Sequence, residues 1–272
     1  MDWINRLLRV SFEFLASMFG GAHPFLSLTI ISILVGIGML WVFGRTSNQT
    51  AILRTKKRLQ AYLLELRLFG DDLSQVWQSQ VNLMGANMRY FGLMMWPAVY
   101  VIVPLAVVLV HLDASYGLAP LPVGEPSVVT VQWVGPVTDR MEPPRLEAPP
   151  EIAVETAAIR VTDTGQFSWR VRPSQPFTGS LRFTWNGETF EKTISAGGGM
   201  PYLSVRRVAS IWDSFIYPGE DRVTGSPVQW IEVRYPARSI TLAGFEIHWL
   251  VWFFVFSMVA GYALKGYFKV TL

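Results

Sequence analysis

Three long apolar runs dominate the hydrophobic pattern of the chain. They extend over Phe25–Phe43, Tyr90–Leu112 and Ile247–Leu264, and the only Asp, Glu, Lys, Arg or His residues within them are His111 and His248. Each run approaches or exceeds the roughly 18 residues expected of a membrane-spanning helix. The pattern therefore predicts three transmembrane helices, within residues 23–44, 90–112 and 245–272.

The first 22 residues show a different, amphipathic pattern. Apolar side chains recur on one side of a helix and charged ones on the other: Trp3, Leu7, Val10 and Phe14 against Arg6, Arg9 and Glu13. A signal peptide is the alternative, but Glu13 interrupts the apolar core and no clean cleavage site follows. We predict an interfacial helix over residues 1–22 that leads into the first span.

Between the first two spans, residues 45–89 predict a helical hairpin. Thr50–Phe69 has a helical apolar face formed by Ile52, Leu59, Leu63 and Leu66. Gly70 can adopt the left-handed conformation that ends a helix, and Asp72 with Gln75 resembles a capping box. The second helix carries an apolar stripe that continues into the second span: Leu73, Trp77, Val81, Met84, Met88, Phe91 and Met95.

Residues 113–244 alternate between apolar and polar positions, which is typical of β-strands. Asn186–Gly187 between two such runs predicts a type I′ hairpin turn, Pro136–Pro150 an extended linker, and Ser204–Ile216 a helix. The fold class expected is thus an α-helical membrane protein with three transmembrane helices, a cytoplasmic hairpin and an inserted extracytoplasmic antiparallel β-sandwich. The expected strands are Ser127–Val134, Ala157–Val161, Gln166–Arg172, Ser180–Trp185, Glu188–Ile194 and Val228–Tyr235.

Loop charges predict the orientation. Residues 45–89 contain seven Lys or Arg residues against three Asp or Glu residues, so the positive-inside rule places the hairpin in the cytoplasm. The N-terminus and the β domain are then outside, and the C-terminal tail is inside. We expect a multi-pass protein of a bacterial inner (cytoplasmic) membrane.

Composition excludes several kinds of chemistry. Without cysteine the chain can form neither disulfides nor thiolate sites, and His23, His111 and His248 are too far apart in sequence to suggest a metal site. The net charge of +3 is explained by basic residues flanking the spans, so we expect no DNA binding. The β segment contains no His and no nucleophile motif. We expect neither enzyme activity nor a cofactor.

The order of elements resembles the YidC/Oxa/Alb superfamily of membrane protein insertases, in particular its three-span branch. That branch includes archaeal YidC-like proteins and the insertase subunit of the endoplasmic reticulum membrane complex. The resembling segments are Lys56–Leu105 (KKRLQAYLLELRLFGDDLSQVWQSQVNLMGANMRYFGLMMWPAVYVIVPL) and Glu246–Gly266 (EIHWLVWFFVFSMVAGYALKG). The resemblance implies guidance of client helices into the bilayer through a cytoplasm-facing groove, without nucleotide or metal.

Candidate client-binding residues follow from this resemblance and from residue chemistry. Arg89 can attract polar client segments at the groove mouth, or else anchor the span at the headgroups. Flexible, polarizable Met side chains suit an adaptable client surface, or else fill gaps in helix packing: Met84, Met88, Met94 and Met95. The basic cluster Lys56, Lys57 and Arg58 can contact lipid headgroups or the ribosome, or form a solvated face.

Two functions remain open at this point. The first is an insertase or assembly factor whose partners are membrane-protein clients. The second is a non-catalytic structural subunit of a larger inner-membrane complex, with the β domain as docking module. The second is favoured by the uncharged first span, which offers only the hydroxyls of Ser27, Thr29 and Ser32, and by the richness in aromatic residues. It is also favoured by a C-terminal segment, Gly261–Leu272, without an evident task.

Overall fold

The computed structural model describes residues 6–7, 9–11, 24–69, 71–138, 141–225, 227–242 and 245–271. The chain forms two compact units. One combines residues 1–28 with 107–249 and contains the β-sheets, and the other combines residues 29–106 with 250–272 and contains most of the long helices.

Two helices are long and apolar enough to cross a membrane. They are α2, Pro24–Thr46, and α4, Leu73–Leu112, which a short π-helical turn at Asp113–Gly117 extends. The third apolar run forms a shorter helix, α6, Trp249–Leu264. It starts later than predicted because Ile247 belongs to a two-stranded hairpin formed by β10, Ile240–Leu242, and β11, Phe245–Ile247.

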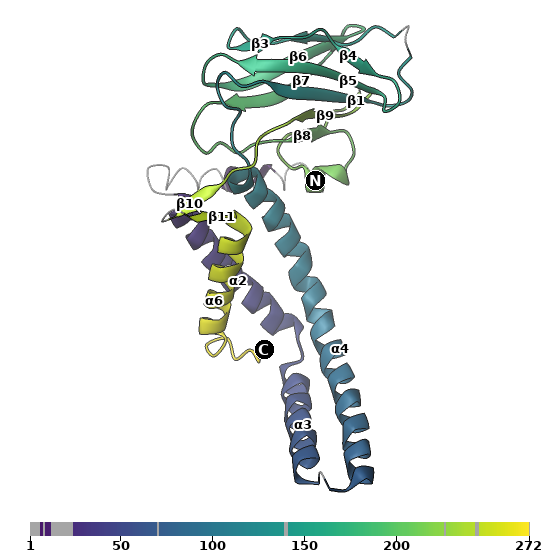
Figure 1. The fold of residues 1–272 in the computed structure, drawn as a ribbon, viewed down its shortest axis with the longest axis vertical. Helices are drawn as coiled ribbons and strands as arrows, with labels where there is room; N and C mark the ends of the chain where they lie inside the picture. Colours follow the sequence, from purple (N-terminus) through teal and green to yellow (C-terminus); the bar gives the residue numbers. More distant parts are fainter. Residues whose placement is uncertain are drawn as a thin grey trace. The chain divides into compact units, whose positions relative to one another are not determined.

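The predicted helical hairpin consists of α3, Gln49–Leu68, and the first part of α4 (Figure 1). Asn48 caps α3, its Oδ1 accepting a hydrogen bond from the Ala51 amide at 3.0 Å. The two helices are linked where the Ser79 hydroxyl donates to the Glu65 carboxylate at 3.1 Å. Gly70, the expected C-cap, lies outside the described residues.

The start of α4 confirms the predicted Asp72 cap. The Asp72 carboxylate accepts hydrogen bonds from the amides of Ser74 at 2.9 Å and Gln75 at 3.3 Å. These bonds satisfy amides that have no partner within the first turn of a helix. Pro97 and Pro104 both lie within α4, which continues past them.

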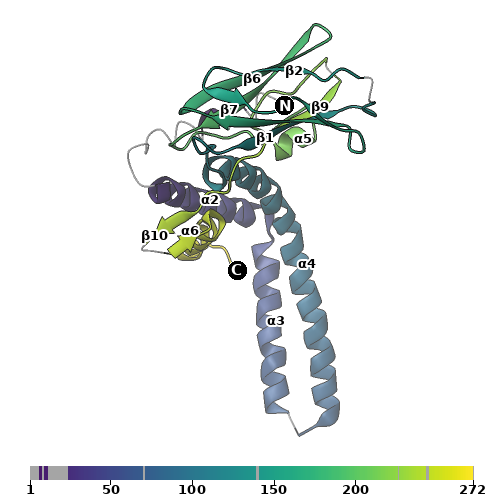
Figure 2. The same ribbon diagram turned by 45° about the horizontal axis from the view of Figure 1, so that its top comes forward.

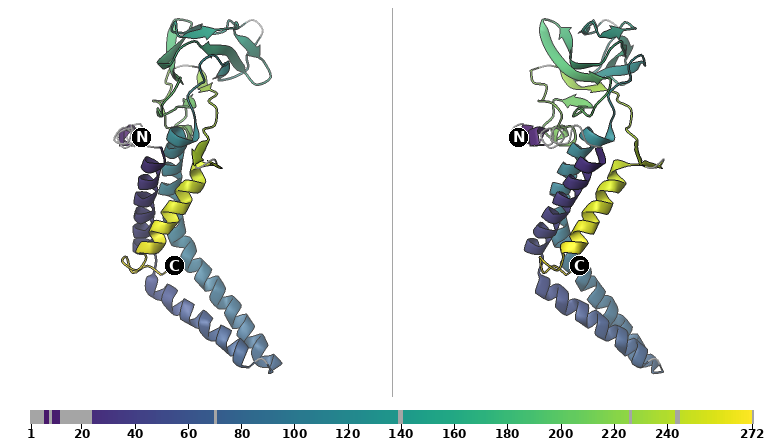
Figure 3. Two further views of the ribbon diagram at one scale, coloured as in Figure 1. Left: turned by 60° about the vertical axis from the view of Figure 1, so that its left-hand side comes forward. Right: turned by 90° about the vertical axis from the view of Figure 1, so that its left-hand side faces the viewer.

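Helices α2 and α6 pack closely within the helical unit (Figure 3). A Cβ added at Gly36 would lie 2.5 Å from the carbonyl oxygen of Ser257, so the two backbones nearly touch. The indole of Trp252 donates a hydrogen bond to the Thr29 hydroxyl at 2.8 Å. Small residues allow this close approach between apolar helices.

The C-terminal tail also has a structural task that its sequence did not reveal. Val270 is buried, and a Cβ added at Gly44 would meet its side chain at 2.9 Å. The amide of Thr271 donates to the Gln49 side chain at 2.7 Å. The tail therefore returns to the junction between α2 and α3.

The β domain contains two larger antiparallel sheets (Figure 2). In the first the strand order is β3-β5-β1-β9-β8, with β4 also paired to β5, and in the second it is β2-β6-β7. Their bounds are β1 Ser127–Trp133, β2 Arg145–Glu147, β3 Ile152–Val154, β4 Ile159–Val161, β5 Gln166–Pro173, β6 Phe177–Trp185, β7 Glu188–Ala196, β8 Arg206–Val208 and β9 Val228–Val233.

Both sheets contribute to one hydrophobic core. Val131 of β1 and Phe167 of β5 belong to the same buried cluster as Phe183 of β6 and Ile194 of β7. Alternation along β1 and β5 puts every second side chain into this cluster, as expected for strands buried on one face.

The Asn186–Gly187 turn between β6 and β7 is confirmed. Both residues have positive φ, 48° and 83°, which a type I′ turn requires at its two central positions. Asparagine tolerates this conformation and glycine adopts it without steric cost.

Two predictions in this domain are wrong. Most of Ser204–Ile216 is not helical: residues 206–208 form β8, which pairs with β9, and only α5, Asp213–Ile216, is a helix. Pairing with an edge of the sheet overrides the local helical spacing of apolar residues. The stretch 136–150 is likewise not only a linker, because β2 within it pairs with β6.

Candidate functional site

The apolar stripe predicted on α4 is exposed along its whole length. Its members include Trp77, 72% exposed, and Met88, 65% exposed, and the complete stripe, called here the α4 apolar face, is Leu73, Trp77, Val81, Met84, Met88, Phe91 and Met95. An exposed series of large side chains at positions three or four apart is a surface for another apolar element.

The seam with α3 uses a different side of α4. Ser79 is buried there against Glu65, and Val76 and Leu83, three before and four after it, are half-buried. Because the helical repeat separates this seam from the α4 apolar face, the apolar residues of that face are left outside the hairpin.

The Met residues proposed for client contact differ in exposure. Met84, Met88 and Met95 are exposed on the α4 apolar face, whereas Met94 is half-buried. At the tip of the hairpin, Leu73 and Trp77 of this face line a shallow depression of ≈ 780 Å³ together with Ser74, Val76 and Gln80.

Arg89 lies elsewhere on the same helix. It is exposed, but the helical repeat places it about 100° around the axis from Met88. It shares its side with Gln78 and Asn82 rather than with the Met residues. The structure therefore brings the Met candidates together and leaves Arg89 on a polar side of α4.

The basic cluster of α3 is spread around that helix. Lys57 and Arg58 are exposed and Lys56 is half-buried. Since successive residues of a helix point about 100° apart, the three charges do not form a single face.

The hydroxyl groups of the first span are engaged within the protein. The Tyr116 hydroxyl donates to Ser27 at 2.8 Å, Trp252 donates to Thr29, and Ser32 is fully buried. These groups stabilise contacts between apolar segments, where an unsatisfied polar group is costly.

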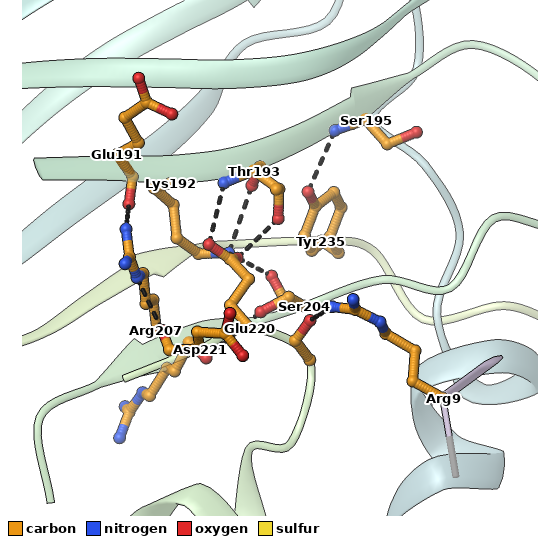
Figure 4. A network of polar contacts seen from close by, with 12 residues as sticks. Arg9, Glu191, Lys192, Thr193, Ser195, Ser204, Arg207, Glu220, Asp221 and Tyr235 are labelled. Atoms are coloured by element: carbon orange, nitrogen blue, oxygen red, sulfur yellow. Dashed lines mark hydrogen bonds and ion pairs between the residues drawn. The ribbon is translucent and has the colours of Figure 1, made fainter. Parts of the chain in front are cut away.

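A buried polar cluster in the β domain was missed by the sequence predictions (Figure 4). Lys192 has no exposed surface, and its ammonium forms an ion pair with the Glu220 carboxylate. The same ammonium donates to the Ser204 carbonyl at 2.6 Å and to the Thr193 carbonyl at 3.2 Å. Lys192 lies between Phe190 and Ile194 on the inward-facing side of β7. A Lys at an inward position of a predicted strand was the available sequence signal for this cluster.

Burial and ion pairing shift the pKa values of the two charged groups in this cluster. Burial lowers the pKa of Lys192, because the charged ammonium is deprived of water. Burial also opposes ionisation of Glu220, but the Lys192 charge and hydrogen bonds from Lys192 and Thr193 outweigh it, and the pKa of Glu220 lies below its ordinary value. The pair joins β7 to the loop around residue 220.

The residues on either side of Glu220 hold the N-terminal segment. Arg6 forms a 2.8 Å ion pair with Asp221. Arg9, which Figure 4 shows reaching this loop, donates to the Gly219 carbonyl at 3.0 Å. Arg6, Leu7, Arg9, Val10 and Ser11 are helical, and the remainder of the predicted interfacial helix lies outside the described residues.

Comparison of the chain with protein-family models, with curated proteins and with solved structures finds no match. Within the part of the chain that the structure describes, no three His, Cys, Asp or Glu side chains are grouped so as to hold a metal ion.

Proposed function

We propose that this protein is an insertase or assembly factor of the YidC/Oxa type that receives client helices on the α4 apolar face. The observation that supports this is the exposure of seven large apolar side chains, from Leu73 to Met95, on a helix that continues into a membrane-spanning length. Such a face can guide an apolar client helix from the hairpin toward the bilayer without nucleotide.

The complete architecture proposed has three spans, formed by α2, the later part of α4, and α6. Helix α6 has 16 residues, about 24 Å at the helical rise, and its contact with α2 at Gly36 and Thr29 supports placing it in the bilayer. We propose a bacterial inner membrane, with the hairpin and C-terminus in the cytoplasm. The β domain, a sandwich of two sheets over their shared core, is then outside.

Photocrosslinking tests the client surface directly. A photoreactive residue at Met88 should crosslink to a nascent client helix, and the same residue at Asn82, on the polar side of α4, should crosslink much less. Equal crosslinking at the two positions would show that the apolar face is not the client surface.

Arg89 is tested separately with purified protein in liposomes. If it attracts clients, Arg89→Glu should impair insertion of a reporter with an acidic translocated tail more than that of one with a neutral tail, and Arg89→Lys should be tolerated. If it only anchors the span, the two tails should respond equally. Failure of the wild-type protein to insert either reporter above the protein-free background would rule out the insertase.

A structural subunit is the second candidate. It is favoured by the close contact of Gly36 with Ser257 and by the hydrogen bonds of Ser27 and Thr29, which engage these hydroxyls within the protein instead of leaving them to line a polar path. In that case a fixed partner covers the α4 apolar face. Purification from native membranes distinguishes the two, since a stoichiometric complex supports the subunit and heterogeneous nascent chains support the assembly factor.

A further inference from the structure

A second exposed apolar surface lies in the β domain, around the short helix α5. Trp212 is 79% exposed and Ile216 is 58% exposed, and Ile211 is also exposed. The turn that presents them is well ordered by hydrogen bonds: the Ser214 hydroxyl donates to the Ile211 carbonyl at 2.7 Å, and its amide donates to the Ser210 carbonyl at 3.2 Å. These hydrogen bonds fix the backbone of the turn, and its three apolar side chains are exposed.

The N-terminal segment adds to this surface. Leu7 and Val10, one turn apart, are both exposed, while Arg6 and Arg9 next to them point to the loop at Asp221 and Gly219. That loop begins directly after α5, since only two residues separate Ile216 from Gly219. The segment and the α5 turn are therefore neighbours, and both present apolar side chains outward.

A short series of contacts joins this region to the end of α4. The Leu203 amide donates to the Ala114 carbonyl at 2.9 Å, just beyond the last α-helical turn of α4. The adjacent Ser204 carbonyl accepts from Lys192, which pairs with Glu220 between the two residues that hold the N-terminal segment. All of these residues belong to one compact unit. The exposed surface thus lies close to the point where an apolar, membrane-length helix ends.

We propose that this surface is a membrane contact, in which the β domain and the N-terminal segment jointly insert apolar side chains into the lipid headgroup region. Its residues, called here the interfacial surface, are Leu7, Val10, Ile211, Trp212 and Ile216. The lipid bilayer is the occupant because the surface is joined to the end of α4 by this series of contacts and presents a Trp, which is favoured at the membrane–water boundary.

The ion pair and hydrogen bond of Arg6 and Arg9 give this contact a definite geometry. They fix the N-terminal segment to the β domain, so that two elements far apart in sequence enter the bilayer together. The contact would restrain the β domain at the membrane surface. It does not depend on the function proposed above, since it makes no use of the α4 apolar face.

Site-directed spin labelling tests the proposal in the intact 272-residue chain, which contains no cysteine. Single cysteines at Trp212 and Ile216 are labelled with a nitroxide after reconstitution into vesicles of phosphatidylcholine and phosphatidylglycerol. Collision with oxygen, which concentrates in lipid, is compared with collision with a water-soluble nickel chelate. Val134, another exposed apolar residue of the β domain, provides the matched control.

The expected result is preferential oxygen collision at 212 and 216 and preferential nickel collision at 134. Replacing Leu7 and Val10 together by Ser should reduce the oxygen preference at 216, because the second half of the contact is lost. Nickel preference at all three positions would overturn the proposal. Immobilised labels at 212 and 216 in native membranes but not in pure lipid vesicles would also overturn it, in favour of a protein partner.

Discussion

Gly36 of α2 lies against the backbone of Ser257 in α6, with space for a hydrogen atom but not for a side chain. A Cβ at position 36 would be 2.9 Å from the Ser257 Cα, whereas Gly38 on the same helix has nothing within 4 Å of the equivalent point. The contact between these two helices therefore requires glycine at one position and tolerates a side chain two residues later.

We expect Gly36→Leu to separate the two helices and to destabilise the detergent-solubilised protein by about 1–3 kcal/mol, the usual cost of forcing extra atoms into a packed contact. Gly38→Leu should have little effect. Thermal unfolding of both variants in the same detergent measures the difference. Similar unfolding temperatures would contradict the packing of α6 on α2.

The buried ion pair of the β domain predicts a large effect of removing one partner. Glu220→Ala leaves the Lys192 ammonium without its carboxylate in a site that water does not reach, and such a change costs about 3–5 kcal/mol. Glu188→Ala, on an exposed part of β7, should change stability little. Denaturant unfolding followed by Trp fluorescence provides the comparison, and equal midpoints would be inconsistent with a buried pair.

Acid should weaken the same pair. Because the pKa of Glu220 is lower in the folded protein than its ordinary value of 4.5, its contribution is fully present above pH 4.5 and is lost as the pH falls through the folded-state pKa. A single proton changes stability by at most about 1.4 kcal/mol per pH unit. Glu220→Gln should therefore show a shallower loss of stability below pH 4.5 than the wild type, as measured by unfolding at a series of pH values. An unchanged slope would mean that Glu220 is not the group responsible.

Asp72 predicts a local effect at the tip of the hairpin. Asp72→Ala removes the acceptor of the Ser74 and Gln75 amides and should cost about 1 kcal/mol of local stability. Limited proteolysis between Arg67 and Gln80 should then become faster. Asp71→Ala, next to it in sequence, is the control, and equal cleavage of the two variants would argue against the cap.

The proposed orientation can be tested with the same cysteine-free background. A cysteine at Gln75 should be protected from a membrane-impermeant thiol reagent in intact cells, and one at Thr189 should be labelled. Both positions are exposed in the structure, so protection reports the side of the membrane rather than burial. The opposite labelling pattern would require the opposite orientation.

Local sequence patterns correctly predicted the elements whose structure depends mainly on residues close in sequence. Long apolar runs produced membrane-length helices α2 and α4, period-two alternation located β1, β5, β6, β7 and β9, and the Asn186–Gly187 pair specified its turn. The Asp72 cap could also be predicted, because an N-cap depends only on the residues of its own helical turn.

Hydrogen bonding between residues far apart in sequence determined the elements that local patterns did not predict. Ser204–Ile216 has helical apolar spacing, but hydrogen bonding of residues 206–208 to β9 makes them a strand. The same kind of pairing recruits β2 from a proline-rich stretch.

The candidate functional residues likewise depend partly on local spacing and partly on tertiary contacts. The sequence by itself determined that α4 carries an apolar stripe, because the helical repeat depends only on spacing. Only the tertiary structure decided that this stripe faces outward, since the choice of the Ser79 side as the seam depends on α3. Likewise, Lys192 became a buried partner of Glu220 because β7 and a loop 28 residues away in sequence pack together, and no local pattern records such a contact.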